Sequence, residues 1–418
     1  MPRDILLALG LALTPATQLR MGGLPLGAGE LVLSGWLFLA FTAQLGGGTL
    51  TVGPAFRAIL VFWSALWLAL SIGLVCGFAL DLFQDLPAML HDVFAYLLMM
   101  SLGMMLALEF GNADRRLRVC AYFTGLGTAL LLVQLAGGEG LSIFPGMQSW
   151  YFDRFQGWSE NPNQMGFFAA VLSFVALHLA QTAPTNLGKI GAVLCAGIAI
   201  IGGILTRSDS FMVALLIGTA AWVLVTARVW LGTLQSGVML RGAAVVFAML
   251  AVPLASATFA PFGAAALERI EQTTEIIYSD NDQGETRLAL WVEAMQRGMR
   301  SAFLGFGPGP QLTSKAYKRP PPSKFEAHNT FLDLFTQGGL LAVVAFVWVC
   351  MAALRTAWQV QLAGLVALVC ALASFSMFHF VVRQPIFWFI IVLSLLAATR
   401  VPDAPNRNSR WDRVGPMP

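Results

Sequence analysis

Residues 55–80 read AFRAILVFWSALWLALSIGLVCGFAL, an apolar run whose only charged residue is Arg57. A helix that crosses the hydrocarbon core of a membrane needs roughly 20 such residues. The whole chain shares this character, because 57% of its 418 residues are hydrophobic and only 11% are charged. Soluble proteins carry about 25% charged residues. The sequence therefore predicts an all-α integral membrane protein.

Apolar runs of this kind recur along the chain and predict about twelve transmembrane helices. The expected spans are 4–19, 30–45, 55–80, 88–110, 117–137, 162–182, 188–206, 208–227, 240–259, 331–352, 360–378 and 384–399. This pattern divides the chain into nine spans in 1–259, a large loop at 260–328, three spans in 331–399 and a polar tail at 400–418.

The distribution of basic residues predicts the orientation of these spans, because short cytoplasmic loops are enriched in Lys and Arg. With the N-terminus in the cytoplasm, the cytoplasmic set is Arg3, Arg57, Arg115, Arg116, Arg118, Lys189, Arg228, Arg241, Arg355, Arg400, Arg407, Arg410 and Arg413. Outside the long loop, the opposite side holds only Arg20, Arg154, Arg207 and Arg383. Both termini are thus predicted to be cytoplasmic, and the loop 260–328 is predicted to face away from the cytoplasm.

The exported loop contains two amphipathic stretches, 265–278 and 286–303. In the second stretch, Leu288, Trp291, Met295, Met299 and Phe303 recur at helical spacing. Such a helix is typical of a segment that lies flat on a membrane, whatever the function of the protein.

His328 stands at the end of this loop, immediately before an expected span, with Glu326 close by. Imidazole titrates near ~6.5, so histidine is the usual general base near neutral pH. Thr330 and Asp333 resemble a capping box at the start of the span. His328 is therefore a candidate catalytic base, and Glu326 or Asp333 is a candidate to orient its ring.

Three arginines are candidates for anion binding, because charged side chains near the hydrocarbon region are costly and tend to be functional. Arg207 either forms a local ion pair with Asp209 or grips an anion, and Arg383 allows the same two interpretations. Arg154 is expected to reach the lipid headgroups. The asparagines in 161–163 are explained by capping of the helix that follows.

Several other chemistries are not expected. The net charge of +3 is too small and too scattered for nucleic-acid binding. The glycines of 303–309 suggest a nucleotide loop but follow a helix on the non-cytoplasmic side. The acidic stretch DNDQGE (280–285) departs from the calcium-loop pattern. The five cysteines lie within apolar runs. No metal site, disulfide or cofactor is predicted.

Five motifs together resemble the O-antigen ligase and polymerase superfamily, over residues 150–390. The first is the stretch that contains the candidate histidine, and the others occur in the family's order. They are HNTFLDLFTQGGLL (328–341), RFQGWSENPNQMGFF (154–168), LTRSDS (205–210), ETRLALWVEAM (285–295) and FLGFGPG (303–309). In LTRSDS, Ser208, Asp209 and Ser210 replace the small residues that usually follow the arginine.

The resemblance implies a GT-C-like enzyme of the bacterial inner membrane. It would transfer a glycan from undecaprenyl diphosphate to a saccharide hydroxyl at the periplasmic face, in a single inverting displacement without metal or ATP. The family's catalytic histidine maps onto His328, and its diphosphate-binding arginines map onto Arg207 and Arg287.

Other functions remain open at this point. A ligase would use lipid A–core as its acceptor, whereas a polymerase would join lipid-linked repeat units of O-antigen or exopolysaccharide. The signature of the loop favours the ligase slightly. A lipid-glycan transporter or flippase and a non-catalytic assembly protein are the alternatives from other classes. No internal repeat of the kind found in transporters is visible.

Overall fold

The chain forms a bundle of α-helices. A computed structural model describes residues 1–20, 27–46, 52–80, 85–141, 144, 146–233, 287–313 and 324–398. Within these residues, eight helices are long and apolar enough to cross a membrane, and two shorter apolar helices accompany them. The expectation of an all-α integral membrane protein is confirmed in this form.

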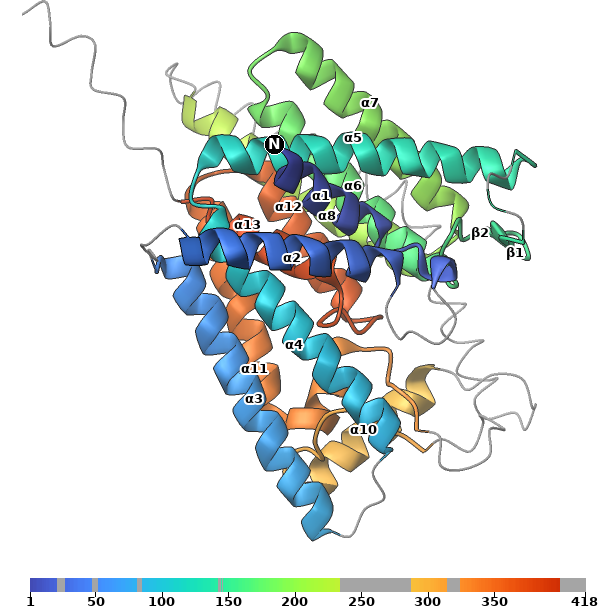
Figure 1. The fold of residues 1–418 in the computed structure, drawn as a ribbon, viewed down its shortest axis with the longest axis vertical. Coiled ribbons are helices and arrows are strands. Elements are labelled where there is room, and N and C mark those ends of the chain that lie inside the picture. The colour runs from blue at the N-terminus through green and yellow to red at the C-terminus, as the bar shows by residue number, and fades with distance from the viewer. Residues whose placement is uncertain are drawn as a thin grey trace, which may run out of the picture.

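The helices follow the predicted order of apolar runs (Figure 1). Their bounds are α1 Pro2–Leu13, α2 Ala28–Gly46, α3 Pro54–Ala79, α4 Leu86–Glu109, α5 Ala113–Gly138, α6 Pro162–Thr182, α7 Asn186–Leu205, α8 Asp209–Thr233, α10 Arg287–Arg300, α11 Thr330–Gln359, α12 Ala363–Ser376 and α13 Pro385–Leu395. A 3-10 turn at Thr17–Leu19 follows α1, and a small hairpin pairs β1 Trp150–Tyr151 with β2 Arg154–Phe155.

The first predicted span is shorter than expected. α1 has 12 residues, which corresponds to about 18 Å of helix, whereas the hydrocarbon core is about 30 Å thick. The expected span 240–259 and the amphipathic stretch 265–278 lie outside the described residues. The count of twelve spans and their orientation therefore stay predictions.

Helix α6 lies at the centre of the packing. In its most apolar stretch 78% of the residues are buried, whereas this share is at most 44% in the other long helices. It contacts α5, α7, α8 and α12. Because α6 is enclosed on several sides, the residues at its N-terminus are held in fixed positions relative to these neighbours.

A cluster of aromatic rings joins α3, α4 and α13. The Trp63 and Trp388 ring centroids are 4.9 Å apart, as are those of Phe62 and Trp388. Tyr96 stands at the edge of this cluster, 6.2 Å from Trp63. Each of these four side chains is fully buried. The cluster anchors the part of α4 that faces the cavity described below.

Helix α11 is interrupted at Gly339, where φ is 63°. Segment 303–309 fills the interruption, because Phe306 N donates to Thr336 O (2.9 Å) and Leu340 N donates to Phe303 O (2.9 Å). A Cβ at position 339 would lie 1.9 Å from Phe303 O. Of the glycines of 303–309, Gly305 packs closely against α11, whereas Gly307 and Gly309 lie against α3 and α4.

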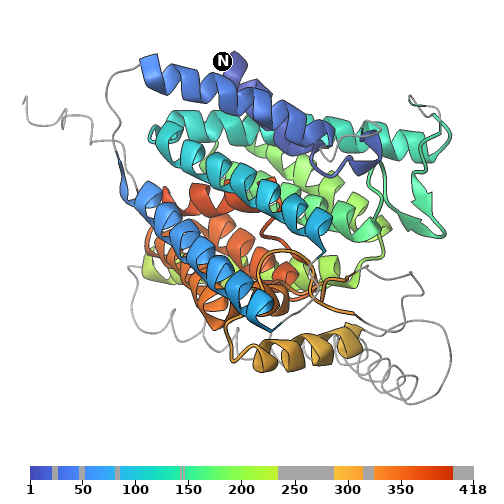
Figure 2. The ribbon, with the colours of Figure 1, turned by 60° about the horizontal axis from the view of Figure 1, so that its bottom comes forward.

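Helix α10 lies beside α11 at the edge of the bundle (Figure 2). Its packed face is Leu290 and Ala294, which are buried. Of the face predicted from the sequence, Met295, Met299 and Phe303 are about half exposed (46%, 49% and 52%). The helix therefore presents two apolar faces, one toward α11 and one outward, and the outward face suits contact with lipid.

Candidate functional site

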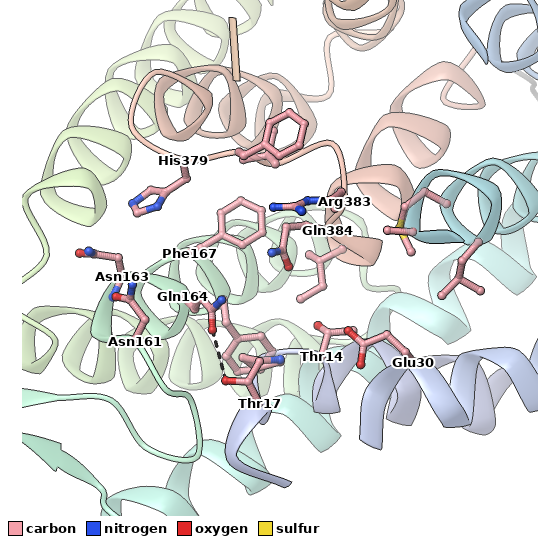
Figure 3. Close-up of a pocket in the computed structure, with 18 of the residues that line it drawn as sticks. Thr14, Thr17, Glu30, Asn161, Asn163, Gln164, Phe167, His379, Arg383 and Gln384 are labelled. Atoms are coloured by element: carbon pink, nitrogen blue, oxygen red, sulfur yellow. Dashed lines mark hydrogen bonds between the residues drawn. The ribbon is translucent and has the colours of Figure 1, made fainter. Parts of the chain in front are cut away.

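A cavity of about 510 Å³ opens between five segments of the chain (Figure 3). Its walls come from the α1–α2 region, α4, the start of α6, the residues before α11 and the connection between α12 and α13. This volume lies within the range of small-molecule sites. His328, Glu326 and Arg383 all line it, so the structure brings together three of the residues that the sequence singled out.

His328 is exposed to the cavity in an unusual backbone conformation. Its φ is 52°, a left-handed value that is costly for a residue with a Cβ and that tends to mark functional sites. The residues on both sides of it are held in place. Trp291 Nε1 donates to Ala327 O (3.1 Å), and the buried Asp333 carboxylate accepts from Ala327 N (2.7 Å) and Asn329 N (3.1 Å).

The cap of α11 differs from the capping box expected from the sequence. Asn329 is the N-cap, and its side-chain oxygen accepts from Phe331 N and Leu332 N. Thr330 is the first helical residue, and its hydroxyl donates to His379 O. The helix thus begins one residue earlier than expected, and the Asp333 carboxylate supports the backbone around His328.

Arg383 joins two carboxylates from distant parts of the chain. Its guanidinium forms ion pairs with Asp92 of α4 and with Glu326, and it lies 4.9 Å from the Phe380 ring centroid. Burial opposes its charged form, but Glu326 and Asp92 outweigh this and hold the pKa of Arg383 above its usual range. The sequence allowed either a local ion pair or the binding of an anion by Arg383. The structure shows an ion pair, but its partners are distant in the sequence.

Asp92, Tyr96 and Gln337 were missed by sequence reasoning. Tyr96 donates to Gln337 Oε1 (2.5 Å), and Gln337 Nε2 donates to Asp92 Oδ2 (3.5 Å). Asp92 lies within the expected span 88–110, and its side chain in α4 is 1% exposed. An acidic residue inside an apolar run was the available signal, and its partner Arg383 is 291 residues away.

Arg207 and Arg154 are not among the residues that line the cavity. Arg207 sits in the turn between α7 and α8 with φ 47° and pairs with Asp153, whereas the expected partner Asp209 begins α8. Arg154 Nε donates to Thr206 O (3.1 Å), so it braces this turn where the sequence predicted a reach to headgroups. Arg287 is the first residue of α10, and its side chain is outside the described part.

Two further histidines, His91 and His379, also line the cavity. His379 Nε2 is 3.2 Å from Ser210 Oγ, and His91 Nδ1 is 3.4 Å from Asp92 Oδ1. Among the described residues, no three His, Cys, Asp or Glu side chains are grouped in a way that could hold a metal ion. The polar part of the cavity lining consists of imidazoles, an ion-pair network and neutral polar groups, and apolar side chains complete it.

Comparison with protein families gives one match. Residues 192–347 match a family model described as O-antigen ligase. The matched segment contains most of α7, all of α8 and α10, His328 and the first part of α11. No curated protein matches the chain. The resemblance to the O-antigen ligase and polymerase superfamily is confirmed by this match.

Proposed function

We propose that this chain, whose residues 192–347 match the O-antigen ligase family, transfers a glycan from undecaprenyl diphosphate to a saccharide hydroxyl at the periplasmic face of the bacterial inner membrane. One observation carries the proposal. His328 lies in a cavity of about 510 Å³, with a left-handed backbone that is fixed from both sides by Asp333 and Trp291.

In the proposed reaction, the imidazole of His328 takes the proton of the acceptor hydroxyl. The acceptor oxygen forms a bond to the anomeric carbon as the bond from that carbon to the diphosphate oxygen breaks, and the electron pair leaves with the lipid diphosphate. A single displacement inverts the configuration at this carbon. General-base assistance contributes about 10²–10⁴-fold, and the sugar–diphosphate bond supplies the driving force without ATP.

Arg207 and Arg287 are the proposed diphosphate ligands. A guanidinium is a permanently charged planar fork that matches phosphate oxygens, and such donors stabilise charge that develops on a leaving group. Arg207 pairs with Asp153, and both side chains are more than half exposed (64% and 62%). Exposed ion pairs contribute little free energy, so a phosphate can replace Asp153 at low cost.

Glu326, Asp333, Arg383 and Arg154 have supporting roles in this proposal. Asp333 holds the backbone on either side of His328. Arg383 fixes Glu326 to α4 through Asp92, and it is already neutralised by these two carboxylates. We therefore assign Arg383 to positioning of the loop end and leave the diphosphate to Arg207 and Arg287.

Replacement of His328 by Ala tests the proposal. In cells that lack the native gene, the variant should be present in the membrane at the normal level and should abolish glycan transfer. The exposed residue Lys189, at the start of α7, supplies the matched control Lys189→Ala. Normal surface and carrier-linked glycans in the His328→Ala strain would reject the enzymatic proposal and favour transport or assembly.

The same strain separates ligase from polymerase. Loss of long-chain lipopolysaccharide with free polymer on the carrier lipid identifies a ligase whose acceptor is lipid A–core. Accumulation of single lipid-linked repeat units identifies a polymerase of O-antigen or exopolysaccharide. The HNTFLDL signature at 328–334 favours the ligase.

A further inference from the structure

Three side-chain amides line the cavity at the start of α6. They are Asn161, Asn163 and Gln164, and the stretch Asn-Pro-Asn was explained by helix capping from the sequence. The cap is present, since Asn161 Oδ1 accepts from Asn163 N (2.8 Å). Capping uses only the carbonyl half of this side chain, however, and leaves the function of its NH2 group open.

The carbonyl oxygens of the other two amides are also engaged with the protein. Asn163 Oδ1 accepts from Arg154 Nη2 (2.9 Å) and Ser208 Oγ (2.8 Å). Gln164 Oε1 accepts from Ser159 Oγ (2.8 Å) and Thr17 Oγ1 (3.4 Å), and Figure 3 shows the second of these bonds. Backbone N–H and guanidinium groups cannot accept, so the orientation of both asparagine amides is fixed.

The three NH2 groups are available to a ligand, since the protein contacts each amide through its oxygen. In the described part of the chain, none of them has a hydrogen-bond acceptor. Figure 3 shows the three amides on one side of the cavity. Each NH2 has two donors and no acceptor capacity, so together they form a donor array that faces ligand oxygens.

The charge of the cavity lining indicates whether the donor array binds phosphate oxygens or saccharide oxygens. Two arginines, Arg20 and Arg383, and two glutamates, Glu30 and Glu326, line the cavity, so their formal charges cancel. A diphosphate is best held by cationic donors, whereas neutral amides without surplus positive charge suit hydroxyl, ring and acetamido oxygens. The donor array thus matches a saccharide better than a phosphate group.

The donor array is also connected to the proposed diphosphate site. Arg154 donates both to Asn163 Oδ1 and to Thr206 O, the residue before Arg207. We infer that Asn161, Asn163 and Gln164 form the subsite for the sugar residue directly attached to the donor diphosphate. This inference rests on the proposed function. It assigns donor selection to α6, whose residues precede the matched segment 192–347.

Three near-isosteric substitutions test the subsite: Asn161→Asp, Asn163→Asp and Gln164→Glu. Each keeps the oxygen that binds the protein and replaces the NH2 group with a second oxygen. Asp is as good an N-cap as Asn, so folding is preserved at position 161. Asn186→Asp, at the exposed start of α7, is the matched control.

Transfer is measured in membrane vesicles from cells that lack the native gene, at low and at saturating lipid-linked glycan. Each variant should lose about tenfold or more at low donor, because a lost hydrogen bond and a new oxygen–oxygen repulsion amount to about 1.4 kcal/mol or more. The loss should largely disappear at saturating donor. Inhibition by inorganic pyrophosphate should be unchanged, and Asn186→Asp should behave as the wild type.

Two results would overturn the subsite. The first is a wild-type transfer rate in all three variants at a low concentration of the glycan donor. The second is weaker inhibition by pyrophosphate in the variants, which would assign the donor array to the diphosphate. Failure of the proposed function is distinguishable from failure of the subsite, because only the former predicts that the His328→Ala variant still transfers glycan. If one variant does not accumulate in the membrane, the other two decide the question.

Discussion

Replacement of Arg383 by Met probes the ion-pair network that ties the residues before α11 to α4. The Asp92 side chain is 1% exposed and that of Arg383 is 19% exposed. Removal of one partner from a buried pair costs about 3–5 kcal/mol, because the other charge is left uncompensated. Glu326 is 20% exposed and retains some hydration, so most of this cost should fall on Asp92.

The assay is the half-life of the folded protein in detergent at a fixed elevated temperature, since large membrane proteins rarely unfold reversibly. A loss of about 3 kcal/mol shortens the half-life roughly hundredfold if it acts entirely on the unfolding barrier. Arg300→Met, which removes an exposed arginine of α10, should leave the half-life nearly unchanged.

The double variant Asp92→Asn/Arg383→Met isolates the electrostatic cause. The amide removes the uncompensated charge, so we expect the double variant to recover about 2–3 kcal/mol relative to Arg383→Met, as a coupling energy between neighbouring residues. Arg383 stays charged at every working pH because its pKa is held above its usual range. The reasoning is refuted if Arg383→Met stays within twofold of the wild-type half-life, or if the double variant is no more stable than the single one.

Three further substitutions test separate features. Gly339→Ala should destabilise the protein by about 1–3 kcal/mol or more, because φ is 63° and a Cβ would meet Phe303 O. The control is Gly35→Ala, at a position in α2 with open space around it, which should be neutral or stabilising in the same thermal assay. Asp333→Asn should lower the transfer rate about tenfold or more at normal protein levels, because one of two backbone N–H groups beside His328 loses its charged acceptor. Burial and Arg297 lower the pKa of Lys324 to about 8, so above pH 8 the unfolded state binds more protons than the folded state. The stability of the wild type relative to Lys324→Met should therefore rise between about pH 8 and 10.5. A stability difference that does not change with pH would contradict this.

The sequence predicted the helices well because membrane insertion depends on local properties. An apolar run such as 55–80 needs no distant partner to be recognised, and α3 occupies Pro54–Ala79. The position of His328 at the end of a loop was equally local. The match over 192–347 supports the family assigned from the same motifs.

The composition of the site depended on distant contacts and was predicted only in part. Asp92 and Arg383 are 291 residues apart, and no periodicity connects them. Arg154 was expected to face headgroups, but the fold brings Thr206 and Asn163 within its reach. The donor array could not be predicted for another reason. Helix capping is a sufficient explanation of the asparagines in the sequence, and only the three-dimensional structure shows that their NH2 groups line a cavity.

The break in α11 has a consequence for how the imidazole is carried. The first turns of that helix take part of their hydrogen bonding from segment 303–309, and the residues before them are tied to Trp291 and Asp333. The catalytic candidate is thereby held by α10 and by the residues packed into the break, and not by the regular part of its own helix alone. A ligand that moves α10 or segment 303–309 should therefore move the imidazole as well.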